Sequence, residues 1–499
     1  MLNPTQETLG MLKASLGTPK DQDLNKSVSI STGLVYYDLQ APAKNLYPVI
    51  TPLRNKIPRV SRKFSGNATN WKQITSILGS GYNAMGWVPE GQRSGTMSYT
   101  AVDKAATYVT IGEEDSLTFE AENAAQGFED ENAMVTFRLL QKMMQKEEMA
   151  LLGGNRSLSL AAPATPTLSA SGSGATLPAL TYSVVAVALT FEGFKNSSVV
   201  GGVATSQTVT GADGKTFAVN GGSSNKSGAA TQAVTLGQTL FASVPAVQGA
   251  VGYAWYTGAA GSEKLEKITT VNSAAFSAPL AGTGQAATAV TANCSVNASL
   301  AFDGLLTQAL NPANLAYVNV LPTGTAGTGT ALTASGRGTV NEIDQMLQSM
   351  WDTYRISPTV LYVNSQELKN VTSKCLSNSS GPLLKYEQDA ASGGNYNLTA
   401  GGTIGWYFNP FTPNGGAKIP VLIHPDLPAG TIIAWAETLP PWYQSNEVPN
   451  VAEVITRKDY YRMDWPLRTR QREYGVYAKE TLAIYATFAC GVLCNIANG

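Results

Sequence analysis

Between Ser159 and Leu300 the chain almost stops using charged residues. The acids and bases of this stretch are Glu192, Lys195, Asp213, Lys215, Lys226, Glu263, Lys264, Glu266 and Lys267. An acidic, methionine-rich segment ending at Gly153-Gly154 precedes the stretch, and the ordinary mixture of charged and apolar residues resumes after it. Such a change of composition on both sides is typical of an inserted domain. We therefore predict a separate module over 159–298, inserted into a host fold.

The module has the pattern of an all-β sandwich. Short runs rich in β-branched and aromatic residues alternate with Gly, Ser and Asn turns, at 180–189, 203–209, 217–219, 233–243, 252–256 and 267–271. The segment from Val244 to Tyr256 resembles a strand pair of an immunoglobulin-like or fibronectin type III-like domain. Tyr253, Trp255 and Tyr256 could stack on sugars of a host surface, but packing in the sandwich core is the favoured interpretation.

The first third of the chain is extended rather than compact. Residues 1–50 are polar, with four prolines and little periodicity, which is typical of an arm that lies on a partner surface. Over 51–116, the runs 71–77 and 106–111 alternate apolar and polar residues on either side of a glycine-rich tip, 79–95. This pattern predicts a long, exposed β-hairpin.

A helix is predicted next, over roughly 129–152. Its apolar stripe is Phe137, Leu140, Met144 and Leu151. Gly153-Gly154 should end it, since glycine terminates helices readily. The methionines Met143, Met144 and Met149 are expected to lie in a core or a subunit interface rather than in a ligand site.

The last part, 299–499, alternates helix and strand patterns. Helices are predicted over 340–354 and 366–376, and a buried strand over 358–363. A glycine-rich loop over 390–402 is followed by two long strands, 451–461 and 472–486. The fold class of the host is therefore α+β.

Composition limits the possible functions. The 34 Lys and Arg nearly cancel the 35 Asp and Glu, which argues against a nucleic-acid or membrane affinity carried by the whole protein. The longest apolar candidate, 484–496, is too short for a membrane span, and the N-terminus has no signal-peptide pattern, so we expect a soluble chain made in a cytoplasm. The four cysteines are scattered and are interpreted as buried thiols.

No catalytic, cofactor or metal motif emerges, and we predict that the protein is not an enzyme. The Gly324–Gly329 run lacks the strand and helix that aim a phosphate loop, and His424 has no nucleophile motif beside it, so a flexible loop and a structural histidine are expected. Glu113 and Glu114 are interpreted as charges at the start of the long helix.

Taken in order, these elements resemble the major capsid proteins of tailed bacteriophages, the Hong Kong 97 (HK97-like) type of shell fold. The matching segments are Glu148–Gly153, Phe302–Leu306, Pro358–Val363, Arg472–Tyr477, Thr481–Ile484 and Asn495-Ile496. The resemblance implies an N-terminal arm over 1–50, an E-loop hairpin over 51–116, a spine helix over 117–158, an inserted Ig-like domain over 159–298, and A- and P-domains over 299–499.

The same resemblance implies a function and partners. Copies would form hexamers and pentamers of an icosahedral shell around packaged double-stranded DNA, assembled in the host cytoplasm with a scaffolding protein, a portal and cement proteins, and the Ig-like domain would decorate the virion exterior. Some members join subunits by Lys to Asn isopeptide bonds. Lys72 and Lys104 are candidate donors here, although solvated strand charges are the favoured interpretation. An encapsulin-type nanocompartment is the alternative function, and a surface adhesin or tail protein is a further one.

An interface between subunits needs anchors that reach a neighbour. We expect seven residues of the hairpin region to serve, namely Arg59, Arg62, Lys63, Trp71, Tyr82, Trp87 and Tyr99. The basic residues of 54–63 and 457–472 suit ion pairs between subunits better than DNA contacts, because acidic runs at 113–115 and 129–131 offer complementary charge.

Overall fold

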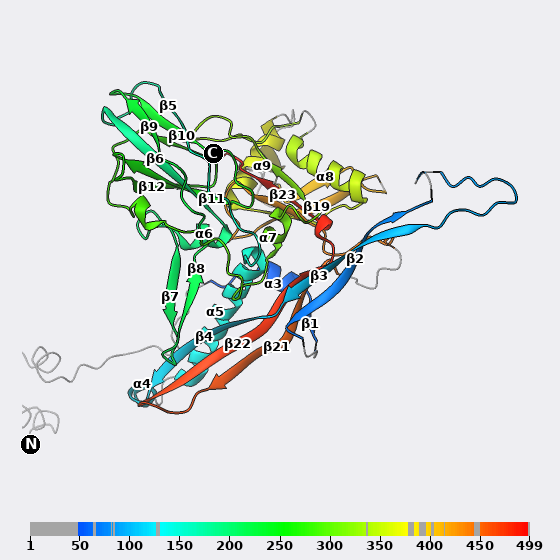
Figure 1. Ribbon diagram of the computed structural model, residues 1–499, viewed down its shortest axis with the longest axis horizontal. Coiled ribbons are helices and arrows are strands. Elements are labelled where there is room, and N and C mark those ends of the chain that lie inside the picture. The colour runs from blue at the N-terminus through cyan, green and yellow to red at the C-terminus, as the bar shows by residue number, and fades with distance from the viewer. Residues whose placement is uncertain are drawn as a thin grey trace, which may run out of the picture. The chain divides into compact units, whose positions relative to one another are not determined.

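The computed structural model describes residues 48–62, 66–80, 82, 85–125, 130–335, 338–377, 384–388, 396–400, 404–413, 415–443 and 450–497 (Figure 1). The predicted arm therefore lies outside the described residues, apart from its last three positions. The predicted α+β class is confirmed. The chain divides into two compact units, of which one holds 49–116 and 135–499. The other contains the short helix α4 (Phe119–Ala124), where the Thr118 hydroxyl accepts a hydrogen bond from the Ala121 N–H.

The predicted long hairpin is present. Strands β2 (Ala68–Leu78) and β3 (Ser98–Thr107) pair antiparallel along their whole length (Figure 1). The predicted strand 106–111 is wrong in one respect, because the backbone leaves the hairpin at Tyr108 and β4 (Val109–Thr118) joins another sheet. That sheet has the order β1-β21-β22-β4, with β1 at Arg59–Ser61, β21 at Ala452–Asp464 and β22 at Gln471–Ile484.

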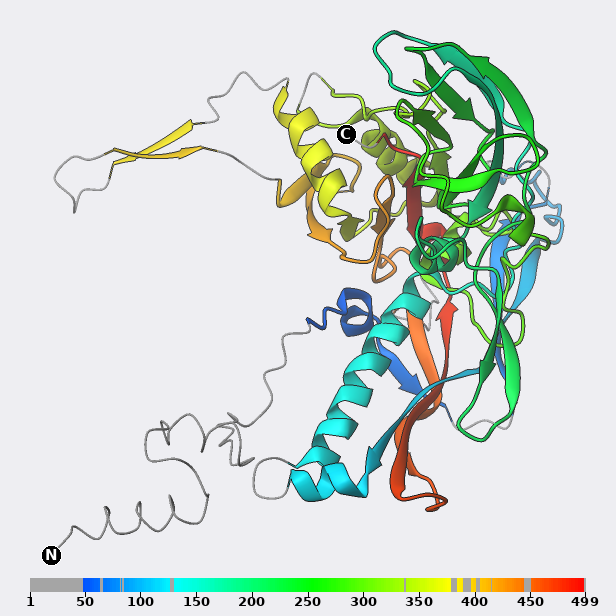
Figure 2. The same cartoon turned by 90° about the vertical axis from the view of Figure 1, so that its left-hand side faces the viewer.

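The long helix α5 (Glu131–Gly153) ends at the predicted glycine and runs alongside β21 and β22 (Figure 2). The predicted apolar stripe is right at Leu151, which is buried, and wrong at Phe137, which is 47% exposed. The other buried side chains of the helix are Val135, Leu139, Met143, Glu147, Glu148 and Leu152. Two carboxylates thus lie on the buried face of the helix, which is possible only where they have partners.

The module contains two sheets that pack face to face. One has the order β13-β10-β5, with strands Ser273–Phe276, Thr239–Ser243 and Thr167–Ser171, and the other has the order β12-β11-β6-β9, with strands Lys264–Thr269, Gly252–Gly258, Leu180–Leu189 and Ala230–Val234. Side chains from both sheets share one core, and Trp255 is fully buried in it. A second apolar cluster covers the other face of β6, which explains its continuous apolar run. The predicted sandwich is present, and its immunoglobulin-like identity stays a prediction.

One strand prediction in the module is wrong. The run 233–243 is two strands in different sheets, because Gly237 adopts φ +92° in a turn that the Gln238 N–H closes onto the Thr235 carbonyl. Strands β7 (Ser206–Thr210) and β8 (Thr216–Asn220) overlap the predicted runs 203–209 and 217–219, and they pair with each other as a separate two-stranded hairpin.

The rest of the host is a six-stranded mixed sheet of order β14-β23-β20-β15-β19-β18, whose strands are Tyr317–Val320, Cys490–Cys494, Ile432–Trp435, Val360–Val363, Ala417–Ile423 and Trp406–Asn409. Helix α8 (Asn341–Tyr354) packs on β23 through Met346 and Met350, and α9 (Ser365–Ser377) packs on β15 and β19. Both helices lie where the sequence predicts them. Part of the predicted loop 390–402 is strand β17 (Tyr396–Ala400), paired with β16 (Leu384–Gln388), and the rest of that loop lies outside the described residues.

A buried polar contact fastens the module to the host. The Asn495 amide donates to the Asn272 side-chain oxygen at 3.0 Å and to the Leu321 carbonyl at 2.7 Å, while the Asn272 backbone N–H donates back to Asn495 at 2.9 Å. The loop at 324–329 also touches the module, because the Gly327 N–H donates to Ser273 at 2.9 Å.

Candidate assembly interface

The outer half of the β2–β3 hairpin has one apolar face and one mixed face. In the cross-strand register, Ile74 lies opposite Ala101 and Ile77 lies opposite Tyr99. In a regular strand, Ile74 and Ile77 would point to opposite faces, because side chains alternate. The register shifts between Ile74 and Ser76, so Thr75 is an extra residue that brings both isoleucines to the same face as Tyr99.

This face, which we call the apolar hairpin face, comprises Ile74, Ile77, Tyr99 and Ala101. The first three side chains are 62%, 66% and 65% exposed. The opposite face carries the polar side chains of Gln73, Ser76 and Thr100. Its apolar side chains, Val102 and Leu78, are less exposed than those of the apolar hairpin face. A contiguous exposed apolar surface of this kind marks a binding site for another molecule.

The tip of the hairpin continues the exposed apolar surface. Tyr82 is 83% exposed and Trp87 is 90% exposed, and Met85 and Met97 are also largely exposed. Of the aromatic anchors predicted from the sequence, Tyr82, Trp87 and Tyr99 are therefore free to meet a partner. Trp71 is different, because it lies at the hairpin base, on the face opposite to Ile74, with its ring edge-on to Tyr485 at 5.4 Å.

Buried carboxylates of α5 hold the segment that leads to the hairpin. Glu148 accepts hydrogen bonds from the backbone N–H groups of Leu53 and Arg54, at 2.9 and 2.8 Å, in the first turn of α3 (Pro52–Lys56). Its Oε1 also lies 2.7 Å from His424 Nε2, and both side chains are buried. The Asp426 N–H donates to His424 Nδ1, which leaves Nε2 as the ring nitrogen that faces Glu148.

Glu147 forms the centre of a second network. Its carboxylate accepts from Arg54 Nε at 2.7 Å, from Arg59 and from the Tyr460 hydroxyl. The Arg59 guanidinium also donates to Asp459 and Glu480, at 2.7 and 2.8 Å. Burial, and then the neighbouring charge of Glu147, raises the pKa of Glu480 above its ordinary value. The two networks fix residues 52–59 against α5, β21 and β22 within one chain.

The predicted basic anchors lie differently from the aromatic ones. The Arg59 guanidinium is held by three carboxylates of its own chain, and Arg62 lies 3.5 Å from the Tyr485 hydroxyl. Lys63 lies outside the described residues. That Arg59, Arg62 or Lys63 takes part in contacts between subunits stays a prediction.

Sequence reasoning missed Glu147 and Glu148 because adjacent acids on a helix resemble a solvated surface. Their partners lie between 88 and 313 residues away, so no local spacing reveals them. The interpretation of Glu113 and Glu114 as charges at the start of a helix is wrong: both lie within β4, where Glu113 pairs with Lys146 and Glu114 accepts from the Tyr477 hydroxyl.

Other residues that the sequence analysis singled out lie in the core or contact residues of the same chain. Tyr253, Trp255 and Tyr256 are buried, and the Trp255 indole donates to Thr269 at 2.8 Å, so the preferred core placement is confirmed. All four cysteines are buried and unpaired, as predicted, and burial raises the pKa of Cys490 to about 12. Lys72 lies 3.6 Å from Asp103, and Lys104 donates to Asn314 at 2.9 Å.

Within the described part of the chain, no helix is long and apolar enough to cross a membrane. The same residues include no group of three or more His, Cys, Asp and Glu side chains that is arranged to hold a metal ion.

No model of a known protein family matches the chain, and no curated protein sequence does. Among solved structures, it is similar to the capsid chain of a native GTA particle, at 11% identity and a TM-score of 0.42, over 95% of this chain and 100% of that one. The capsid of Myoviridae phage XM1 matches at 8% identity and a TM-score of 0.38, over 92% and 95% of the two chains. The holo-SrpI encapsulin complex from Synechococcus elongatus matches at 8% identity and a TM-score of 0.39, over 95% and 96%. Capsid chains, the kind of protein that the sequence resembles, are thus among its structural matches.

Proposed function

We propose that this chain is the major capsid protein of a tailed bacteriophage, a structural and non-enzymatic subunit that assembles into an icosahedral shell around packaged DNA. The observation that carries the proposal is the apolar hairpin face. A two-stranded ribbon is marginally stable alone in water, and this one leaves two isoleucines and a tyrosine on one side largely exposed. A second copy that covers this side would bury the apolar surface and stabilise the ribbon.

The contacts that hold the segment leading to the hairpin support the same proposal. A subunit that reaches a neighbour needs a rigid base, since motion at the base would lower the affinity of the contact. Glu147 and Glu148 provide that rigidity, because they tie residues 52–59 to α5, β21 and β22. The proposed domains follow the sequence: arm 1–50, E-loop 51–116, spine helix 117–158, inserted domain 159–298, and A- and P-domains 299–499.

The proposed partners are further copies in hexamers and pentamers, a scaffolding protein during assembly, a portal, cement proteins, and DNA bound without sequence specificity. The near-zero net charge of −1 supports weak rather than tight contact with DNA. The proposed location is the virion, after assembly in the host cytoplasm, and the module would lie on the exterior of the shell.

Sedimentation velocity of the full chain, with and without a candidate scaffolding protein, tests the proposal. We expect a concentration-dependent conversion of subunits into rings or closed particles. The ratio of absorbance at 260 and 280 nm then separates particles that contain nucleic acid from empty ones, and co-purified protein cargo would favour the encapsulin-type alternative. A chain that stays monomeric at every concentration in both conditions would refute shell formation.

A further inference from the structure

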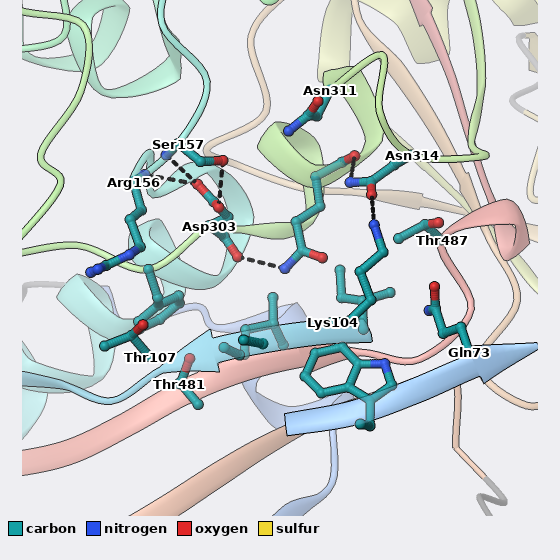
Figure 3. A pocket seen from close by; sticks show the side chains of 17 residues that line it. Gln73, Lys104, Thr107, Arg156, Ser157, Asp303, Asn311, Asn314, Thr481 and Thr487 are labelled. Carbon is teal, nitrogen blue, oxygen red and sulfur yellow. Dashed lines mark hydrogen bonds between the residues drawn. The ribbon is translucent and has the colours of Figure 1, made fainter. Parts of the chain in front are cut away.

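Glu480 is a fully buried acid in β22, beside the segment that leads to the hairpin. Side chains alternate along a strand, so Glu480 points away from Thr481, which lines the pocket at the base of the hairpin (Figure 3). Its Oε2 accepts a hydrogen bond from Arg59 at 2.8 Å. Its Oε1 is shielded from solvent and has no hydrogen-bond partner among the residues that the structure describes. An ionised carboxylate in this position keeps one charged oxygen without a donor, which is unfavourable.

The charged groups around Glu480 come from four elements. Arg59 of β1 is the cation that contacts it, and the same guanidinium donates to Glu147 of α5 and to Asp459 of β21. Arg54 of α3 donates to Glu147 at 2.7 Å. The side chain of Asp459 is 56% exposed, so water stabilises its charge, whereas Glu147 and Glu480 are buried. Two buried carboxylates thus share the Arg59 guanidinium, and their like charges repel each other.

The hydrogen bonds decide which of the two buried acids takes up a proton. Glu147 Oε1 accepts from Arg59, and Glu147 Oε2 accepts from Arg54 and from the Tyr460 hydroxyl. Donors of this kind favour the ionised form, whereas Glu480 Oε1 has no such donor in the described part of the chain. Burial, and then the charge of Glu147, raises the pKa of Glu480 to about 7. The proton is therefore carried by Glu480 Oε1.

From this arrangement we propose that Glu480 and Arg59 form a pH-sensitive switch at the start of the hairpin, which is closed while Glu480 carries a proton and loosens when Glu480 ionises. In the closed state, Arg59 joins the neutral acid to the Glu147 carboxylate, and β1 stays paired with β21. Ionisation places a second buried negative charge on the same guanidinium. An opening that exposes Glu480 to solvent relieves the repulsion, so the open state becomes more populated.

Low pH favours the closed state, because Glu480 binds its proton more tightly there than in the open state. The pKa of about 7 belongs to the closed state, and an exposed Glu480 has the ordinary value of about 4.3. The contribution of Glu480 to stability is therefore fully present below the ordinary value and is lost as the pH rises through about 7. Between pH 6 and pH 8.5, these two values correspond to a rise of about tenfold in the open fraction.

Two backbone hydrogen bonds report whether β1 is attached to β21. The Arg62 N–H donates to the Thr456 carbonyl at 3.0 Å, and the Val454 N–H donates to the Pro58 carbonyl at 2.9 Å. Strand β1 spans only three residues, so few backbone bonds hold it besides the contacts of Arg59. The switch lies within one chain, and it holds whether or not the chain forms a shell.

Hydrogen exchange of the unassembled full-length chain tests the proposal, with rates corrected for the intrinsic effect of pH. We expect the protection factors of the Arg62 and Val454 amides to fall about tenfold from pH 6 to pH 8.5. Glu480→Gln, which cannot ionise, should remove this fall. Glu192→Gln is the matched control: Glu192 also has a raised pKa but lies in the module, so its replacement should leave the fall at Arg62 and Val454 unchanged.

Infrared spectra give a second measurement. Glu192→Gln and the double variant Glu192→Gln/Glu480→Gln should differ at pH 6 by the C=O stretch of one protonated carboxylic acid, and this difference should vanish at pH 8.5. Wild-type protection factors that stay constant from pH 6 to pH 8.5 would overturn the proposal, even if Glu480→Gln does not fold. The same fall in folded Glu480→Gln as in the wild type would overturn it as well.

Discussion

Substitution of Ile77 by Asp tests whether the apolar hairpin face is a contact between subunits. Ile77 is 66% exposed in the single chain. Full burial of an isoleucine is favourable by about 1.5–3 kcal/mol, so covering the exposed two thirds contributes about 1–2 kcal/mol per contact. An unpaired aspartate in the same covered position adds a desolvation penalty of several kcal/mol. We therefore expect Ile77→Asp to weaken each hairpin contact by at least about 3 kcal/mol, which is more than a hundredfold.

The assay is the critical concentration for assembly, measured by light scattering and sedimentation. Ser76→Asp is the matched control: it introduces the same charge one residue away, on the opposite face of the same strand. It should change the critical concentration far less than Ile77→Asp. Both variants should unfold at nearly the wild-type temperature, since exposed substitutions alter stability by only about 0.5 kcal/mol. If Ile77→Asp assembles at the wild-type concentration, the apolar hairpin face is not buried between copies.

Three further predictions concern the stability of the single chain. Burial raises the pKa of Glu192 to about 7, whereas the pKa of the unfolded side chain is about 4.3. The contribution of Glu192 to the stability of the fold is therefore fully present below about pH 4.3 and is lost as the pH rises through about 7. Glu192→Gln should stabilise the chain by up to about 3 kcal/mol at pH 8 and hardly at all at pH 4, as measured by thermal unfolding. Glu148→Ala leaves the N–H groups of Leu53 and Arg54 and the His424 ring without their acceptor, so we expect a loss of about 3 kcal/mol or more and faster proteolysis near residues 52–59, and wild-type proteolysis would contradict the anchoring role. Trp255→Ala should destabilise the module by about 3–5 kcal/mol, and hydrogen exchange should show the loss in β6 and β11 but not in β2 and β3.

The sequence predicts the regular elements of the host well. Helices α8 and α9 and strand β15 lie at their predicted positions, because amphipathic spacing and short β-branched runs are local signals. Gly237 marks the point at which the predicted strand 233–243 divides into two strands. A single glycine is a weak sign of a turn, because glycine also occurs within strands.

The features that build the candidate interface depend on distant or unmarked residues. The bulge at Thr75 decides which side chains share a face, yet threonine is a good strand residue and gives no sign of it. An alternating pattern alone would place Ile74 and Ile77 on opposite faces and would divide the apolar surface between them. The register of the hairpin is therefore necessary to find it.

Burial of Glu147 and Glu148 shows a second limit of local patterns. Helical periodicity treats charged residues as exposed. It therefore assigned Phe137 and Leu140, rather than Glu147 and Glu148, to the buried face of the helix. Arg59, Tyr460 and His424 make burial of these carboxylates possible, and their proximity follows only from the tertiary fold.

Negative-stain electron microscopy of the expressed full-length chain, alone and with a candidate scaffolding protein, tests the central claim most directly. The account predicts closed shells of uniform diameter, or regular rings of five and six subunits, in at least one of the two conditions. Isolated subunits in both conditions, at concentrations where the chain is folded, would contradict it.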